Sequence, residues 1–305
     1  MTKFADLPVI EAPDYHHAWD FFGSSDELGS LNRLTPTALR RAARLVRQGK
    51  VLNLNLPLDK PEIDVSGLRE PYVHHVHGIP GGRDDYLDRF YLQRSSHWDG
   101  LKHVRFKKYG YYGGRQGNAD EPGLGIDVQA GHGIVGRGLL LDVARHGDLG
   151  AERWDPSEPI EITPELLESV AHRQSVEDLE GDILIIRTGW LEWYLQTTHQ
   201  SDEPDRKIRS AGLSANSDMA EWLWDHKFVA VAADNPAVEV LPNRGGGFLH
   251  SRALVLLGIL FGECWSLRDA ADDCERDGTW EGLLVSCPLS LPGGVGSPAN
   301  AYLIK

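Results

Sequence analysis

Short, continuous apolar runs that alternate with helical segments constrain the fold of this chain more than any other feature. The runs Gly138–Val143, Asp182–Arg187 and Val229–Asp234 show little polar alternation, which is typical of strands covered on both faces. Between them, Thr163–Val170 and Ser217–Trp224 carry helical patterns. Alternating strands and helices of this kind predict an α/β architecture.

The first part of the chain fits the same class. Thr35-Pro36 opens a predicted helix that continues to Val46, and Gly49 ends it. Val51–Leu56 then alternates apolar and polar residues, which predicts a half-buried strand. No internal repeat or low-complexity linker interrupts residues 1–305, so we expect a single domain.

A short segment after an extended run combines residues that bind catalytic metals. His97 and Asp99 stand two positions apart, and on a strand such side chains point to the same face. His103 follows four residues later, where the chain can have turned back over the same point. Imidazole and carboxylate are the usual ligands of catalytic zinc, manganese or iron. The spacing therefore indicates a metal-centred active site.

The alternative to a metal site is that a lone His-x-Asp pair, in a chain with 13 histidines, occurs by chance in a surface turn. An open catalytic site needs at least one further ligand from elsewhere in the chain. His250 opens the apolar run Ala253–Leu260, expected to be a buried helix, and Glu263 follows that run directly. A buried carboxylate there is costly unless it is paired or coordinates a cation. The two residues together favour the metal site.

Composition narrows the class of protein further. The net charge of −14 argues against a nucleic acid or an anionic membrane as partner, because binding phosphates requires a basic face. The three cysteines, Cys264, Cys274 and Cys287, show no C-x-x-C spacing and are typical of a reducing compartment. The N-terminus lacks an apolar signal core, and no apolar run reaches membrane-spanning length. We expect a cytoplasmic protein.

Other sequence patterns carry less weight. No G-x-S-x-G motif supports a serine hydrolase, and the glycines at 131, 133 and 136 precede a strand instead of following one, as a dinucleotide site would require. The histidines of Tyr72–His77 have no carboxylate at ligand spacing and are expected to lie on the surface or along a pocket. Lys107–Gly133 is long and irregular, and either shapes a substrate pocket or packs on a neighbouring subunit.

These residues resemble the Putative cyclase family of metal-dependent hydrolases, which includes bacterial kynurenine formamidase and isatin hydrolase. The family motif His-x-Gly-Thr-His-x-Asp-x-Pro-x-His aligns with Gln93–His103. Further similar segments are Asp26–Asn32, Gly181–Trp190 and Gly294–Ala301, so the resemblance extends over nearly the whole chain.

The resemblance implies a swivelling β/β/α sandwich that assembles as a homodimer or homotetramer. It also implies that His97, Asp99, His250 and Glu263 are metal ligands and that His103 donates and accepts a proton. Gln93 stands where two-metal members have a histidine ligand. Because an amide is a poor zinc ligand, we expect one divalent ion, Zn²⁺ or Mn²⁺.

The implied activity is hydrolysis of a C–N or C–O bond in a small carbonyl substrate by metal-activated water, with His103 carrying the proton. The substrate would be an amide, formamide, cyclic imide or lactone, and either ring opening or ring closure fits the family. Trp98, Trp19 and Tyr112 are candidates for an aromatic substrate pocket.

Two other classes stay open at the level of sequence. A non-haem iron oxygenase also uses a His-x-Asp…His triad, although Glu263 as an additional ligand and the strand–helix alternation count against it. The other is a binding or scaffold protein that has kept the fold without activity. The five candidate site residues together argue against that class.

Overall fold

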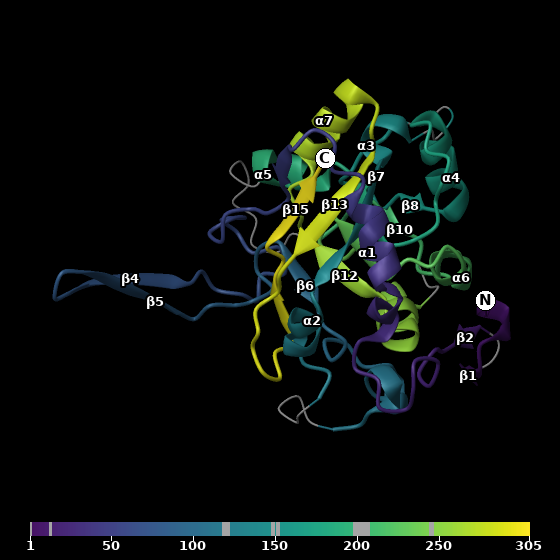
Figure 1. Cartoon of the computed structure of the whole chain (residues 1–305), viewed down its shortest axis with the longest axis horizontal. Helices are drawn as coiled ribbons and strands as arrows, with labels where there is room; N and C mark the ends of the chain where they lie inside the picture. Colours follow the sequence, from purple (N-terminus) through teal and green to yellow (C-terminus); the bar gives the residue numbers. More distant parts are fainter. Residues whose placement is uncertain are drawn as a thin grey trace.

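The computed structural model describes residues 2–11, 14–117, 123–147, 150, 153–197, 208–243 and 247–305. A mixed sheet of nine strands forms its centre (Figure 1). In spatial order the strands are β14 (Gly296–Pro298), β6 (His97–Asp99), β12 (Leu260–Glu263), β11 (Ala230–Ala233), β9 (Ile183–Arg187), β7 (Ile134–Asp142), β13 (Glu281–Ser286), β15 (Ala301–Ile304) and β3 (Val51–Asn53).

The four central strands β12, β11, β9 and β7 are parallel, and the flanking strands pair antiparallel. Their side chains alternate between two hydrophobic clusters. Leu184 and Ile186 of β9 pack on one face, and Ile183 and Ile185 pack on the other. Burial on both faces explains the continuous apolar runs, and the predicted α/β class is confirmed.

Helices cover both faces of the sheet. Helices α4 and α6 contribute to the first cluster, and α7 to the second. The α-helices are α1 (Pro36–Ala43), α2 (Ile126–His132), α3 (Val143–His146), α4 (Pro164–Arg173), α5 (Trp190–Thr197), α6 (Ser217–Asp225) and α7 (Arg268–Asp277). Within the described ranges there are also the 3₁₀ turns η1 (Phe4–Asp6), η2 (Gly29–Arg33), η3 (Lys107–Tyr109) and η4 (Tyr112–Gly114), and the π-helix η6 (His250–Leu256).

Local capping explains where the predicted helices begin. Thr35 accepts a hydrogen bond from the amide of Ala38 (3.2 Å), and Thr163 accepts one from Leu166 (3.3 Å). In both helices proline occupies the first turn, where its missing N–H costs nothing. Helices α1 and α4 therefore start where the sequence predicts, although α1 ends at Ala43 and not at Val46.

Two sequence expectations need correction. The apolar run Ala253–Leu260 is not one buried helix: η6 ends at Leu256, and strand β12 begins at Leu260. Gly258, with φ +68°, lies in the connection and passes close to the backbone of Gly29, so a side chain would clash there. Periodicity alone cannot separate a buried helix from a buried strand in an apolar run as short as Ala253–Leu260. The second correction concerns the strand predicted at Val51–Leu56, which is limited to Val51–Asn53.

Smaller elements complete the fold. Strands β1 (Val9–Glu11) and β2 (Tyr15–His16) pair near the N-terminus, and β8 (Glu161–Ile162) pairs with β10 (Gly212–Leu213). Strands β4 (Val73–Ile79) and β5 (Gly82–Asp88) form a ribbon that extends away from the body (Figure 1). The irregular segment Lys107–Gly133 contains η3, η4 and α2, while its residues 118–122 lie outside the described part.

The histidines expected on the surface or along a pocket belong to the β4–β5 ribbon. His74 pairs with Asp85 (2.7 Å) and His75 with Asp88 (2.9 Å) across the two strands. All four side chains are at least 40% exposed, which places them on the surface.

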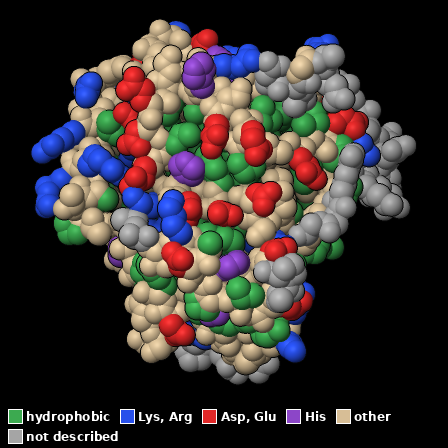
Figure 2. Space-filling model, turned by 90° about the vertical axis from the view of Figure 1, so that its right-hand side faces the viewer, with side chains coloured by type: hydrophobic (Ala, Val, Ile, Leu, Met, Phe, Trp, Pro, Cys, Tyr) green, Lys and Arg blue, Asp and Glu red, His purple; other side chains and the backbone are tan. Residues whose placement is uncertain are grey.

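The molecular surface is consistent with the acidic composition. The face over α4 and α6 carries carboxylates across its middle, with Lys and Arg side chains gathered mainly along its left border (Figure 2). In the described ranges of the chain, no helix is long and apolar enough to cross a lipid bilayer.

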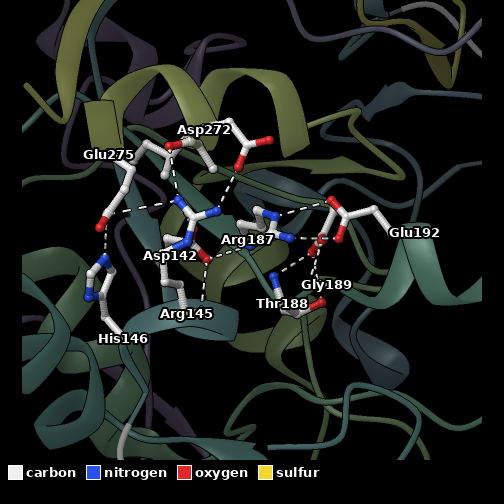
Figure 3. Close-up of polar contacts among 12 residues, drawn as sticks. Asp142, Arg145, His146, Arg187, Thr188, Gly189, Glu192, Asp272 and Glu275 are labelled. Carbon is white, nitrogen blue, oxygen red and sulfur yellow. Dashed lines mark hydrogen bonds and ion pairs between the residues drawn. The ribbon is translucent and has the colours of Figure 1, made fainter. Parts of the chain in front are cut away.

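A partly buried ion-pair network joins the carboxyl ends of β7 and β9 (Figure 3). Arg187 Nη1 donates to Asp142 (2.8 Å), and its Nε and Nη2 make a two-pronged contact with Glu192 (3.1 and 2.7 Å). Arg145 lies on the other side of Asp142 and also pairs with Asp272 (2.6 Å). Asp142 is fully buried, so its charge depends on these arginines.

Replacing Arg187 by methionine keeps the volume but leaves the buried Asp142 without its nearest cation. We expect Arg187→Met to lower the free energy of unfolding by about 3–5 kcal/mol, measured by urea denaturation. The control is Arg40→Met on exposed α1, which should change stability by less than about 0.5 kcal/mol. Equal stability of the two variants would show that the network does not stabilise the fold.

Candidate metal centre

The site is built at the carboxyl end of β12, where β6 runs antiparallel beside it. In this register His97 lies opposite Glu263, and Asp99 lies opposite Phe261. His97 and Asp99 are separated by one residue and therefore share a face of β6, as the sequence predicts. The imidazole of His97 and the carboxylates of Asp99 and Glu263 place one ligand atom each within 4.8 Å of one another.

His250 completes the cluster from the start of η6. Its Nε2 lies 3.1 Å from Glu263 Oε1 and 3.5 Å from Asp99 Oδ2. The structure thus brings together all four residues predicted as metal ligands. The π-helical geometry of η6 is rare in proteins and is often found at functional sites.

Hydrogen bonds fix which nitrogen each ligand histidine presents. His97 Nδ1 donates to the carbonyl oxygen of Ser95 (2.7 Å), and His250 Nδ1 donates to Glu239 (2.5 Å). In the neutral rings this leaves the lone pair on Nε2, the atom that faces the two carboxylates in both residues. A second residue that orients the far nitrogen of a ligating histidine is the usual arrangement in protein metal sites.

Glu239 is a functional candidate that the sequence reasoning missed. It is almost fully buried and also accepts hydrogen bonds from the amides of Leu249 (2.8 Å) and His250 (3.2 Å). The available signal was its place in the apolar stretch Val238–Val240, where a buried carboxylate needs a partner. Sequence spacing alone does not show that the partner is His250.

Burial and charge act against each other in this cluster. Burial lowers the pKa of His250, but its hydrogen bonds with carboxylates outweigh burial and raise the pKa well above its usual value. Burial raises the pKa of Asp99, but the surrounding histidines, His103 first, outweigh it and hold the pKa well below its usual range. Asp99 is therefore a buried carboxylate anion in close contact with imidazoles.

The donor set fits a divalent cation. His97 Nε2 and Asp99 Oδ2 are buried polar atoms without a hydrogen-bond partner, and both belong to the cluster. Buried polar groups without partners are costly, so these two atoms call for a ligand. Two carboxylates balance the charge of one divalent ion, and two imidazoles with two carboxylates suit zinc or manganese.

His103 lies at the edge of the cluster, not within it. Its Nε2 is 3.6 Å from Asp99 Oδ2, and its side chain is 27% exposed, against 1% for Asp99. Burial lowers the pKa of His103 despite the neighbouring Asp99, so the ring is neutral near pH 7. His103 therefore lies close to the proposed metal ligand Asp99 and is also accessible to solvent.

Gln93 bridges Asp99 and His103. A carboxylate only accepts hydrogen bonds, so the Gln93 amide nitrogen must face Asp99, and the same nitrogen lies 3.1 Å from His103 Nδ1. The His103 ring therefore has the Gln93 amide on its Nδ1 side and presents Nε2 toward Asp99. Gln93 therefore occupies the space between the two residues with a donor group instead of a second ligand.

A small cavity opens beside the cluster, with a volume of about 70 Å³. Its wall includes Gln93, His97 and Glu263 of the cluster, together with Ser66, Arg69 and Leu241. Its size suits a small polar group of a substrate, not a whole drug-sized ligand. The residues from the segment Asp64–Arg69 were not identified from the sequence.

The three aromatic residues expected at the substrate occupy different environments. Trp98 is fully buried in the hydrophobic core, donates to Ser286 Oγ (2.8 Å) and packs edge-to-face on Trp265. Tyr112 is also fully buried, and its hydroxyl donates to Asp26 (2.9 Å). These positions correct the expectation for Trp98 and Tyr112, because both side chains are enclosed by the core. Trp19 is half-buried and donates to the Val255 carbonyl of η6 (2.8 Å).

Fold and cluster together define a mixed α/β protein with a buried two-histidine, two-carboxylate centre at a sheet edge. The family model described as Putative cyclase matches residues 52–240, which include His97, Asp99, His103 and Glu239. The chain belongs to this family.

Solved structures agree with this assignment. A crystal structure of a novel cyclase is 31% identical, with a TM-score of 0.81 over 95% of this chain and 97% of the other. Isatin hydrolase A from Labrenzia aggregata, bound to benzyl benzoate, is 17% identical, with a TM-score of 0.58 over 90% and 100% of the two chains. An isatin hydrolase bound to thioisatinate is 15% identical, with a TM-score of 0.60 over 84% and 93%. The last two show a shared fold, and the fold expected from the family is confirmed. Comparison with curated protein sequences finds no match.

The first prediction for the site concerns metal content. We expect purified protein to hold one zinc or manganese ion per chain by elemental analysis, and His97→Ala to lose it, because the ring supplies a buried ligand atom. The matched control is His75→Ala on the β4–β5 ribbon, which should keep the ion. Two ions per chain would show that Gln93 leaves room for a second metal.

The second concerns Glu239. Glu239→Gln keeps the shape but replaces one of two acceptor oxygens with a donor facing main-chain or imidazole N–H groups. We expect metal affinity to fall about 10–100-fold in competition with a chromophoric chelator. Glu165→Gln, on the exposed start of α4, should leave affinity unchanged. An unchanged affinity in Glu239→Gln would mean that Glu239 does not orient His250.

Proposed function

We propose that this protein is a metal-dependent hydrolase that cleaves a C–N or C–O bond in a small carbonyl compound. The observation that supports this most directly is the convergence of His97, Asp99, His250 and Glu263, with the far nitrogen of each histidine tied to a protein acceptor. The substrate class is an amide, formamide, cyclic imide or lactone. The isatin hydrolases, which share the fold, make a cyclic amide such as isatin a reasonable first compound to test.

The four residues would hold one Zn²⁺ or Mn²⁺ ion. When bound, a divalent ion lowers the pKa of a water ligand from about 15.7 to near 7 and polarises a carbonyl oxygen. The protein excludes bulk water from this point, because the side chains of His97 and Asp99 are at most 2% exposed.

His103 carries the proton in this proposal. Its Nε2 edge faces the cluster, so the neutral ring would accept a proton from the attacking water, and the resulting imidazolium would deliver that proton to the leaving nitrogen or oxygen. Gln93 holds the ring in place through its contact with Nδ1. General acid–base catalysis of this kind contributes roughly 10²–10⁴ in rate.

The oxygenase alternative has less support from the structure. Its ligand set is two histidines and one carboxylate with open positions, whereas Glu263 adds a second carboxylate to this cluster. Iron in the purified protein, with oxygen consumption, would favour it instead.

The test is hydrolysis of isatin, an aryl formamide, a cyclic imide and a lactone, with and without a chelator. We expect turnover of at least one compound, lost on chelation and restored by Zn²⁺ or Mn²⁺. Turnover that survives complete removal of metal would contradict the proposal, as would the absence of any turnover by metal-loaded protein across these classes.

For the role of His103, we expect His103→Ala to keep its metal and lose about 10²–10⁴ in kcat, because the proton carrier is gone while the ligands stay. Asp99→Ala should lose the metal itself. The two variants separate proton transfer from metal binding, and full activity in His103→Ala would exclude the assigned role.

A further inference from the structure

A second cleft lies at the opposite edge of the sheet from the metal centre. It has a volume of about 460 Å³, within the usual range of small-molecule sites. Gly181 and Asp182, directly before β9, and Lys227, shortly before β11, form part of its wall. The metal centre lies at the carboxyl ends of the parallel strands, so the length of the strands, roughly 13 Å for β9, separates the two sites.

The wall of this cleft carries an excess of positive charge. Three cations line it, Arg33, Arg41 and Lys227, against two carboxylates, Glu180 and Asp182. Both carboxylates are already paired: Asp182 lies 3.2 Å from Arg41, and Glu180 forms an ion pair with Lys227. Arg33 is therefore the surplus cation.

Arg33 is held in place without a carboxylate partner in the described part of the chain. Its guanidinium stacks on the Trp224 ring at 3.9 Å, and Nη1 donates to the Trp224 carbonyl oxygen (3.3 Å). The nearby Asp225 is paired with Lys3 (3.1 Å) and also accepts from the Phe4 amide. Burial lowers the pKa of Arg33 to about 10, so it stays charged at neutral pH. A largely desolvated cation whose neighbouring carboxylate, Asp225, is already paired with Lys3 is costly, which points to an anionic ligand.

The same cleft offers an apolar wall beside this cation. Phe21 lines it, is 42% exposed and packs edge-to-face on Trp224 with ring centroids 5.2 Å apart. Ala38 of α1 also lines the cleft and leaves space where a larger side chain would fill it. A ring carrying one negative group matches these features better than a bare inorganic anion does.

We propose that this cleft binds a small organic anion, with a carboxylate on Arg33 and an apolar ring against Phe21. Arg33 supplies the charge-assisted hydrogen bonds, and Phe21 covers the ring of the ligand. The site is separate from the metal centre and does not rest on the proposed hydrolase activity.

The experiment is calorimetric titration of the full chain with phenylacetate at millimolar concentration. Phenylacetamide, which has the same ring without the charge, is the matched ligand control. We expect saturable binding of phenylacetate and at least about tenfold weaker binding of the amide, because an ionic hydrogen bond is lost. Equal binding of both ligands, or no binding of phenylacetate, overturns the proposal.

Four variants locate the binding. Arg33→Gln removes the charge, and Ala38→Phe fills the cleft from the half-buried face of α1, so each should weaken phenylacetate binding by at least about tenfold. Arg40→Gln, on the same helix and outside the cleft, and His97→Ala, in the metal centre, should bind as the wild type does. Thermal melting tests whether each variant is folded. If Arg33→Gln is unfolded, the binding measured with Ala38→Phe decides the outcome. Loss of binding in His97→Ala would place the ligand at the metal centre and refute a second site.

Discussion

The candidate site depends on the pairing of β6 with β12, because this register sets His97 opposite Glu263 and turns Asp99 toward the same point. Two buried carboxylates this close repel each other, and the imidazoles of His97 and His250 between them offset the repulsion. Such a cluster contributes little to folding by itself. The presence of this cluster in a buried strand pair is therefore better explained by binding of a cation than by a contribution to folding stability.

Polar chemistry at the carboxyl edge of the sheet divides into two parts with different purposes. At the ends of β7 and β9, Arg187 pairs with both Asp142 and Glu192, so these carboxylates have a permanent cation as partner within the protein. The ion-pair partners of Asp99 and Glu263 on β6 and β12 are imidazoles, whose nitrogens can instead bind a metal ion. This difference in partners distinguishes a structural ion network from a candidate metal site at the same edge of the sheet.

Orientation of the site histidines comes from neighbouring residues that are not themselves proposed metal ligands. Glu239 and the Ser95 carbonyl fix the rings of His250 and His97, and Gln93 contacts Nδ1 of His103. These contacts bring together residues separated by two to eleven positions in the chain. The proposed ligands themselves lie on regular elements, His97 and Glu263 on paired strands and His250 at the start of η6, so they are held in place before any metal binds.

The amino-acid sequence alone predicts the α/β class and the starts of α1 and α4, and it selects His97, Asp99, His250 and Glu263 as candidate ligands, because apolar runs, capping residues and buried charges follow local rules. Alternation along β6 places Trp98 on the face of the strand opposite to His97 and Asp99. Only the packing of the folded chain shows that this opposite face is buried in the hydrophobic core. Three features follow only from packing in three dimensions: η6 ends before β12 begins, Glu239 contacts His250, and Arg33 lines a cleft. Each of these depends on contacts between residues separated in the sequence or on close backbone approach, which residue periodicity does not encode.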